Sequence, residues 1–145
     1  MALNLVKLCV GVSAVEELQA WIDYRLDEKR RLGLDVCQTH TTRMIPKRKD
    51  ELLDGGSLYW VIKGNIQVRQ RLVDLRPFTD PEGIRRCDLV LEPKLVFTEW
   101  QPRRAFQGWR YLKGEDSPAD LGNLARGLQA LPPKLRSELA DLGLL

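Results

Sequence analysis

Two β-rich runs joined by a tight turn constrain this chain more than any other feature. Residues 57–63 (SLYWVIK) and 66–75 (IQVRQRLVDL) are rich in β-branched and aromatic types, and Gly64-Asn65 separates them. Glycine in the first position of a two-residue loop is typical of a type II′ hairpin turn. The sequence therefore predicts an antiparallel hairpin over residues 57–75, and the rest of the chain must supply the layers that cover it.

The position of the turn predicts which side chains share a face of the hairpin. It pairs Trp60 with Arg69 and Leu58 with Arg71 on one amphipathic face. Trp60 is then either half of an internal cation–π pair or an exposed ring that could stack on an unpaired base. The opposite face is expected to be core and carries Tyr59, Val61, Ile66 and Val68.

Helix signals lie on both sides of this hairpin. Ser13 and Glu16 form a capping-box pattern at the start of a helix that runs to about Gly33, and the Pro46 segment predicts a short helix ended by Gly55-Gly56. The Ser117-Pro118-Ala119-Asp120 segment predicts a third helix start. The apolar stripes of the first, third and last helices are Val15, Leu18, Trp21, Ile22 and Leu26; Leu121, Leu124 and Leu128; and Leu135, Leu139 and Leu142.

Further strands are predicted at residues 3–9, 36–45, 86–91 and 95–101, where Trp100 is expected to be structural. Residues 102–113 interleave aromatic and basic side chains and are expected to form a loop or an irregular edge strand. No linker divides the 145 residues. We therefore expect one α+β domain over residues 1–145, a small mostly antiparallel β-barrel or strongly curved sheet with an N-terminal helix and C-terminal helices.

Positive charge is concentrated in the middle of the chain. Residues 43–113 hold 15 basic and 9 acidic side chains, whereas residues 1–42 and 114–145 carry net charges of −1 and −2. A basic segment between mildly acidic ends suggests an anionic partner. The expected nucleic-acid-binding residues are Arg43, Lys47, Arg48, Trp60, Lys63, Arg69, Arg71, Arg103, Arg104, Trp109 and Arg110.

These residues favour a non-enzymatic module that binds RNA or another nucleic acid, with lysine and arginine on phosphates and aromatic rings on bases. Two alternatives stay open. The same cations could orient a small nucleotide-like substrate of an enzyme, with His40 or Glu51 as proton carrier. The surface could instead dock an acidic protein partner.

Several classes of chemistry lack a sequence signal. Cys37 and His40 form the only near pair of metal ligands, and no nucleotide fingerprint or nucleophile elbow occurs, so neither metal nor cofactor is expected.

Three cysteines, odd in number and far apart, favour a reducing, cytoplasmic location. No apolar run reaches the roughly 20 residues of a membrane span. The oligomeric state stays open.

Several segments together resemble a family of small alphaproteobacterial proteins that is a domain of unknown function: LVKLCVG, TRMIPKR, ELLDGGSLYWVIKG, IQVRQRL, IRRCDLVL and FQGWRYL. This resemblance covers nearly the whole chain and implies no activity. The order of a basic short helix, a Gly-Gly turn and long antiparallel strands is also similar to PUA-like β-barrels, which include the ASCH and EVE domains. That likeness implies binding of RNA or modified bases, and no functional residue is carried over from it.

Overall fold

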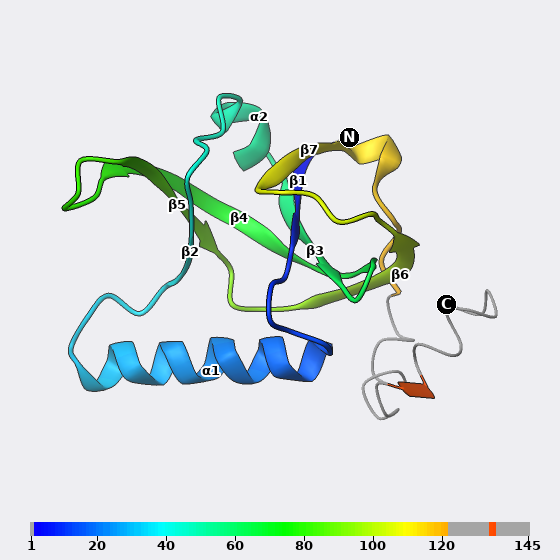
Figure 1. The fold of residues 1–145 in the computed structure, drawn as a ribbon, viewed down its shortest axis with the longest axis horizontal. Coiled ribbons are helices and arrows are strands. Elements are labelled where there is room, and N and C mark those ends of the chain that lie inside the picture. The colour runs from blue at the N-terminus through cyan, green and yellow to red at the C-terminus, as the bar shows by residue number, and fades with distance from the viewer. Residues whose placement is uncertain (1, 122–133, 136–145) are drawn as a thin grey trace.

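A computed structural model describes residues 2–121 and 134–135 of the chain (Figure 1). The described part is α+β and consists mostly of strands. Its elements in chain order are β1 (Leu3–Leu8), α1 (Val15–Arg31), β2 (Gln38–Thr42), α2 (Lys49–Leu53), β3 (Ser57–Ile62), β4 (Asn65–Thr79), β5 (Arg85–Leu91), β6 (Val96–Pro102), β7 (Trp109–Lys113) and the 3-10 turn η1 (Gly114–Asp116).

The described strands form one mixed, curved sheet of seven, built around the long strand β4. β3 pairs with one edge of β4, while β5 and β6 follow one another along its other edge. β1 lies parallel to β3, and β7 runs antiparallel to β1. The strand order β2-β5-β4-β3-β1-β7 ends at two different strands, so the sheet is open. The predicted curved, mostly antiparallel sheet is confirmed, and the barrel alternative is wrong.

Helix α1 lies across one face of the sheet (Figure 1). Its buried side chains, Val15, Leu18, Ile22 and Leu26, form the stripe expected of an amphipathic helix. Trp21, predicted to belong to this stripe, is instead 55 % exposed. The stripe is narrower than predicted, because a helix resting on a sheet buries only the side chains that point directly down.

The start of α1 differs by one residue from the predicted capping box. The helix begins at Val15 with Ala14 as its N-cap. Ser13 lies one position earlier, where its backbone N–H and its hydroxyl donate to the two carboxylate oxygens of Glu17 at 3.1 and 2.7 Å. Glu17 therefore supplies the carboxylate that accepts these two bonds across the first turn.

The hairpin forms as predicted, but its register is different. Lys63 and Gly64 both adopt positive φ angles, +48° and +81°, as a type I′ turn requires, so the turn lies one residue earlier than predicted. A register shift between Trp60 and Val61 then places Trp60 opposite Val68 and Tyr59 opposite Arg69. The predicted pairing of Trp60 with Arg69 is wrong.

Both faces of the central strands are buried. One cluster lies under α1 and includes Trp60, Val68 and Trp109. The second lies on the opposite face and consists of Val6, Tyr59, Val61, Ile66 and Leu112, with Leu8 and Phe106 packed against it. The predicted core residues are therefore confirmed as buried, although Val68 belongs to the other face because of the register shift.

The Gly-Gly pair after α2 is required by geometry. Gly55 has a φ of +85°, a left-handed conformation that ends the short helix as predicted. A Cβ atom on Gly56 would lie 2.2 Å from the carbonyl oxygen of Leu52 and 2.3 Å from that of Leu3. This close approach lets β3 start directly beside β1.

The predicted third helix start is wrong where the structure describes it. Residues 117–121 are not helical, and Asp120 forms an isolated antiparallel bridge with Thr98 of β6. Pairing with an existing strand satisfies the backbone groups that a helix would have satisfied internally. Residues 122–133 and 136–145 lie outside the described residues. They contain most of the two predicted leucine stripes: Leu124 and Leu128, and Leu139 and Leu142.

Candidate functional site

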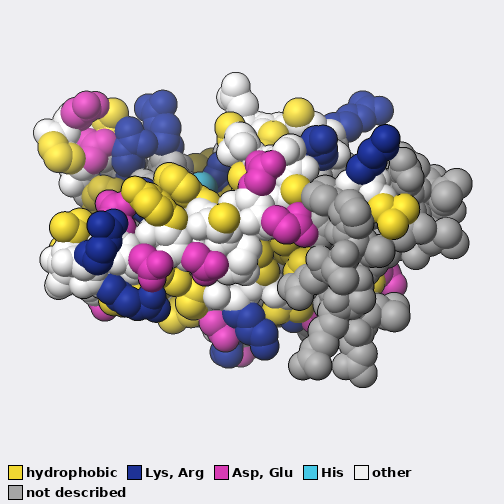
Figure 2. Space-filling view, turned by 90° about the horizontal axis from the view of Figure 1, so that it is seen from below, with side chains coloured by type: hydrophobic (Ala, Val, Ile, Leu, Met, Phe, Trp, Pro, Cys, Tyr) yellow, Lys and Arg dark blue, Asp and Glu magenta, His cyan; other side chains and the backbone are white. Residues whose placement is uncertain are grey.

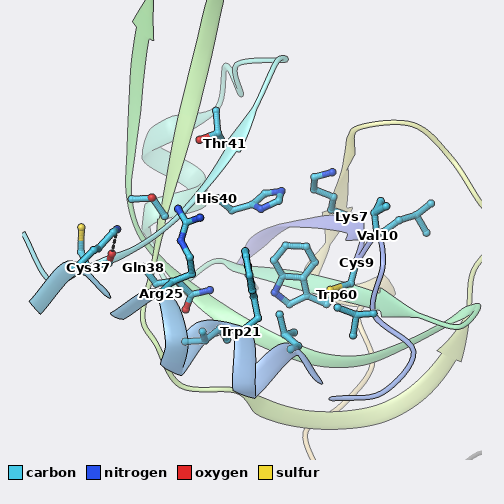
Figure 3. A pocket seen from close by; sticks show the side chains of 16 residues that line it. Lys7, Cys9, Val10, Trp21, Arg25, Cys37, Gln38, His40, Thr41 and Trp60 are labelled. Atoms are coloured by element: carbon cyan, nitrogen blue, oxygen red, sulfur yellow. Dashed lines mark hydrogen bonds between the residues drawn. The ribbon is translucent and has the colours of Figure 1, made fainter. Parts of the chain in front are cut away.

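A hollow of about 370 Å³ lies between α1, the end of β1 and β2, and we call it the α1–β2 pocket (Figure 3). Seen from the α1 side, the surface recedes there, with the histidine side chain at the base of the recess and hydrophobic side chains beside it (Figure 2). Its lining residues are Lys7, Leu8, Cys9, Val10, Val12, Leu18, Trp21, Ile22, Arg25, Lys29, Cys37, Gln38, Thr39, His40, Thr41 and Trp60.

Strand register brings the floor of the pocket together. Lys7 of β1 is the Cα partner of Trp60 on β3 and of Trp109 on β7, so these three side chains form a row on the α1 face of the sheet. Side chains directly opposite on neighbouring strands are close enough to pack against each other. A lysine is therefore held between two indoles.

Hydrogen bonds fix the orientation of Trp60. Its indole N–H donates to the side-chain oxygen of Gln70 at 2.8 Å, and the Gln70 amide donates to the side-chain oxygen of Gln38 at 2.6 Å. The Gln70 side chain is fully buried, and Trp60 is only 3 % exposed. This network joins β3, β4 and β2, and gives the pocket a rigid polar base.

His40 on β2 lies edge-on to Trp60, with ring centroids 5.0 Å apart and planes at 86°. Burial, together with the nearby Lys7 ammonium, lowers the pKa of His40 to about 4, so its imidazole is neutral near neutral pH. Its Nε2 atom is buried and has no hydrogen-bond partner among the described residues. Figure 3 shows the His40 and Lys7 side chains next to each other above the Trp60 ring.

Lys7 and Cys9 follow each other along one side of the pocket. Burial lowers the pKa of the Lys7 ammonium, which has no hydrogen-bond acceptor among the described residues. Burial also raises the pKa of the Cys9 thiol to about 11, which keeps it protonated. A protonated thiol is a poor nucleophile. The reactive group on this side of the pocket is therefore not the Cys9 thiol, and the charged group is the partly desolvated Lys7 ammonium.

The charge of the pocket lining has one sign. Lys7, Arg25 and Lys29 line it, and no Asp or Glu does among the described residues. The Lys29 ammonium donates to the carbonyl of Cys37, and the Arg25 guanidinium lies 5.5 Å from the ring centroid of Trp21. A concave site of one sign attracts ligands of the opposite sign. The arrangement suits an anion with an apolar part.

Three of the predicted basic residues gather beside β7. The Arg48 guanidinium lies 5.6 Å from the ring centroid of Tyr111, and the Lys47 backbone N–H donates to the Tyr111 hydroxyl at 2.9 Å. Arg43 lines a hollow beside Trp109, whose ring touches Tyr111 edge-on. The Tyr111 ring is 37 % exposed.

The other predicted cations lie elsewhere. Arg69 forms a two-point ion pair with Asp120, with contacts of 2.8 and 2.7 Å, and also donates to Ser57. This pairing raises the pKa of Arg69 and lowers that of Asp120. The remaining ones are Lys63 in the hairpin turn, Arg71 on β4, Arg103 and Arg104 after β6, and Arg110, which lies over Phe106.

The two indoles predicted to stack on bases are buried. Trp60 is 3 % and Trp109 4 % exposed, and the Trp109 N–H donates to the Met44 carbonyl at 2.6 Å. Neither ring can therefore stack on a base at the outer surface. The pairing of β3 and β7 with β1 places Trp60 under α1 and Trp109 against the β2–α2 connection. Trp21 is the exposed indole at the pocket. Arg43 and Arg69, two of the predicted cations, line different hollows, and the one beside Arg69 also contains Asp120.

Sequence reasoning missed Lys7, Arg25 and Gln38. The signal for Lys7 was present, because it is the only charged side chain in residues 1–15. Arg25 and Gln38 carry no such signal, since a charged residue on a helix and a glutamine at a strand end are ordinary surface features. The sequence suggested two roles for His40, a proton carrier and, with Cys37, a metal ligand, but not a place in an anion-binding pocket.

Neither a cluster of metal ligands nor a membrane-spanning helix is found among the described residues. No three His, Cys, Asp or Glu side chains among them come together in a way that could hold a metal ion. None of the helices in residues 2–121 is long and apolar enough to cross a membrane.

Fold and site together define a small α+β protein with an open curved sheet and a positively charged pocket beneath its long helix. The chain belongs to the family described as protein of unknown function (DUF1489), which it matches over residues 5–145. Comparison with curated proteins and with solved structures gave no match. The resemblance to a domain of unknown function is confirmed, and no comparison supports the PUA-like likeness.

Proposed function

We propose that this protein binds a small anionic ligand with a flat aromatic part, of the nucleotide class, in the α1–β2 pocket. The observation that carries the proposal is the lining itself: three cationic side chains and two indoles, with no carboxylate among the described lining residues. Phosphate suits Lys7 and Arg25, and a base suits the half-exposed ring of Trp21.

Size and exposure support this ligand class. The pocket volume of about 370 Å³ falls within the range of about 300–1,000 Å³ typical of small-molecule sites. Trp21 is half exposed at the rim and can cover a base, whereas the fixed Trp60 ring forms a floor. Partial burial of Lys7 strengthens its attraction for an anion, because less water screens the charge.

The same chemistry favours binding over catalysis. With a pKa of about 4, His40 is a weak base, whereas a general base works best with a pKa near the operating pH. Glu51 on α2, the other predicted proton carrier, pairs with Arg48 and does not line the pocket. A cytoplasmic location, which the unpaired cysteines favour, is part of this proposal.

Titration calorimetry with the four ribonucleoside monophosphates and the matching nucleosides tests the proposal. We expect at least one monophosphate to bind, its nucleoside to bind about tenfold more weakly, and Lys7→Gln to weaken only the monophosphate. Lys94→Gln, an exposed lysine between β5 and β6, is the matched control. Absence of binding by all four monophosphates at millimolar concentration would contradict the proposal.

A second candidate is the nucleic-acid binding that the sequence suggests, on the surface beside β7. It is favoured by Tyr111, whose partly exposed ring lies against the Arg48 guanidinium and close to the Lys47 backbone. Fluorescence anisotropy with single-stranded RNA at low salt tests it. Arg48→Glu should abolish binding there, and an unchanged affinity would exclude this surface.

A further inference from the structure

A second hollow, of about 410 Å³, adjoins the α1–β2 pocket, and we call it the β2–β7 pocket. Lys7 and Thr41 line both hollows. The residues that line only the second are Thr42, Arg43, Met44, Gln107, Gly108 and Trp109. The two pockets are therefore neighbouring compartments with Lys7 at their boundary.

The position of Lys7 follows from the strand register. Its Cα partners are Trp60, which forms the floor of the first pocket, and Trp109, which lines the second. The Trp109 indole is held by its hydrogen bond to the Met44 carbonyl, so the second pocket has a fixed wall. Because no described side chain neutralises Lys7, its ammonium is available to a group that lies between the compartments.

The charge continues across the boundary. The β2–β7 pocket adds Arg43, which is exposed, and no Asp or Glu lines it among the described residues. A mononucleotide in the α1–β2 pocket can reach Lys7 but leaves Arg43 and the second compartment unused. A ligand that fills both compartments must carry a negative charge between two bulky units.

We propose that the ligand is a dinucleotide unit, with one nucleotide in the α1–β2 pocket and the next in the β2–β7 pocket. The phosphate that links them lies on Lys7, and Arg43 binds the second nucleotide. This inference rests on the proposed function and names its ligand: a free dinucleotide or two consecutive nucleotides of a single strand. Occupying two adjoining sites with one molecule raises affinity because the second contact is intramolecular.

Calorimetry compares the best-binding mononucleotide with the 5′-phosphorylated dinucleotide of the same base. We expect the dinucleotide to bind about tenfold more tightly or better. Arg43→Gln should remove this gain and leave mononucleotide affinity unchanged, whereas Lys7→Gln should weaken both ligands. Arg85→Gln, an exposed arginine at the start of β5, is the matched control, and circular dichroism checks that each variant is folded.

The outcomes separate the two proposals. A mononucleotide that binds as tightly as the dinucleotide overturns the two-compartment ligand and leaves the proposed function in place. Absence of binding by both ligands overturns the two proposals together. An octanucleotide with the same internal dinucleotide distinguishes the sources: equal affinity assigns the site to a strand, and loss of affinity assigns it to the free dinucleotide.

Discussion

Lys7 of β1 lies directly opposite Trp60 of β3 in the parallel register that joins the two strands. A cation in this position loses hydration without gaining a described partner, which is why burial lowers the pKa of the Lys7 ammonium. Uncompensated burial of a charge opposes folding. A charge kept at such a position is explained if it binds a ligand.

Lys7→Met should therefore stabilise the fold and abolish the proposed nucleotide binding. Methionine keeps a long apolar side chain between the two indoles and removes the desolvated charge. We expect the unfolding free energy to rise by about 1 kcal/mol, equivalent to a few degrees in Tm for a domain of this size. Thermal denaturation of wild type and variant measures this change, and a lower Tm in the variant would show that the ammonium has a stabilising partner.

Gln70 is expected to be important for stability because it accepts the indole N–H of Trp60. Gln70→Leu leaves that N–H and the side-chain oxygen of Gln38 without this partner. An unsatisfied buried polar group costs about 1–3 kcal/mol. Urea denaturation should detect the loss, with the exposed Gln107→Leu as a control expected to change stability by less than about 0.5 kcal/mol. Equal stability of the two variants would contradict the role of the network.

Gly56 and Gly83 offer a matched pair of glycine substitutions. Gly56→Ala places a Cβ atom 2.2 and 2.3 Å from two backbone oxygens, so β1, α2 or β3 must move. Gly83, with a φ of +84°, has no atom within 4 Å of an added Cβ, and alanine there meets only left-handed strain of about 1–2 kcal/mol. We expect Gly56→Ala to cost clearly more unfolding free energy in denaturant titrations. Similar costs would mean that the β1–β3 junction is easily displaced.

Local composition predicted which strands form better than it predicted their turn and register. The hairpin was predictable because β-branched and aromatic runs flank a glycine, but its register depended on Lys63, a residue type that seldom adopts a positive φ. The one-residue difference in the turn, with the shift beside Trp60, placed Val68 instead of Arg69 opposite that ring and so moved Val68 to the other face. No local sequence rule predicts this register, because tertiary packing determines it.

The pocket was not predictable for a different reason. Lys7, His40 and Trp60 come from three separate strands, and two of them meet only through the parallel pairing of β1 and β3. Parallel strands are joined by long crossovers, so their register leaves no short-range trace in the sequence. The charge count suggested a cationic site within residues 43–113, whereas three of the cations in the two pockets precede these residues.

His40 should make the fold sensitive to acid. Its folded-state pKa of about 4 lies below the ordinary value of 6.5, so between these values the unfolded chain binds a proton that the folded chain does not. Stability attributable to His40 is complete above pH 6.5 and is lost as the pH falls toward 4, by up to about 3 kcal/mol.

His40→Phe keeps an aromatic ring against Trp60 and removes the titrating group, so the variant isolates this contribution to acid sensitivity. Urea denaturation of both proteins at several pH values between 6.5 and 4 gives the two slopes of unfolding free energy against pH. Carboxylates titrate alike in both proteins and cancel in the difference. We expect the wild type to lose stability more steeply than the variant. Parallel slopes would mean that His40 gains its proton without cost in the folded state and that the pocket admits enough water to hydrate the charge.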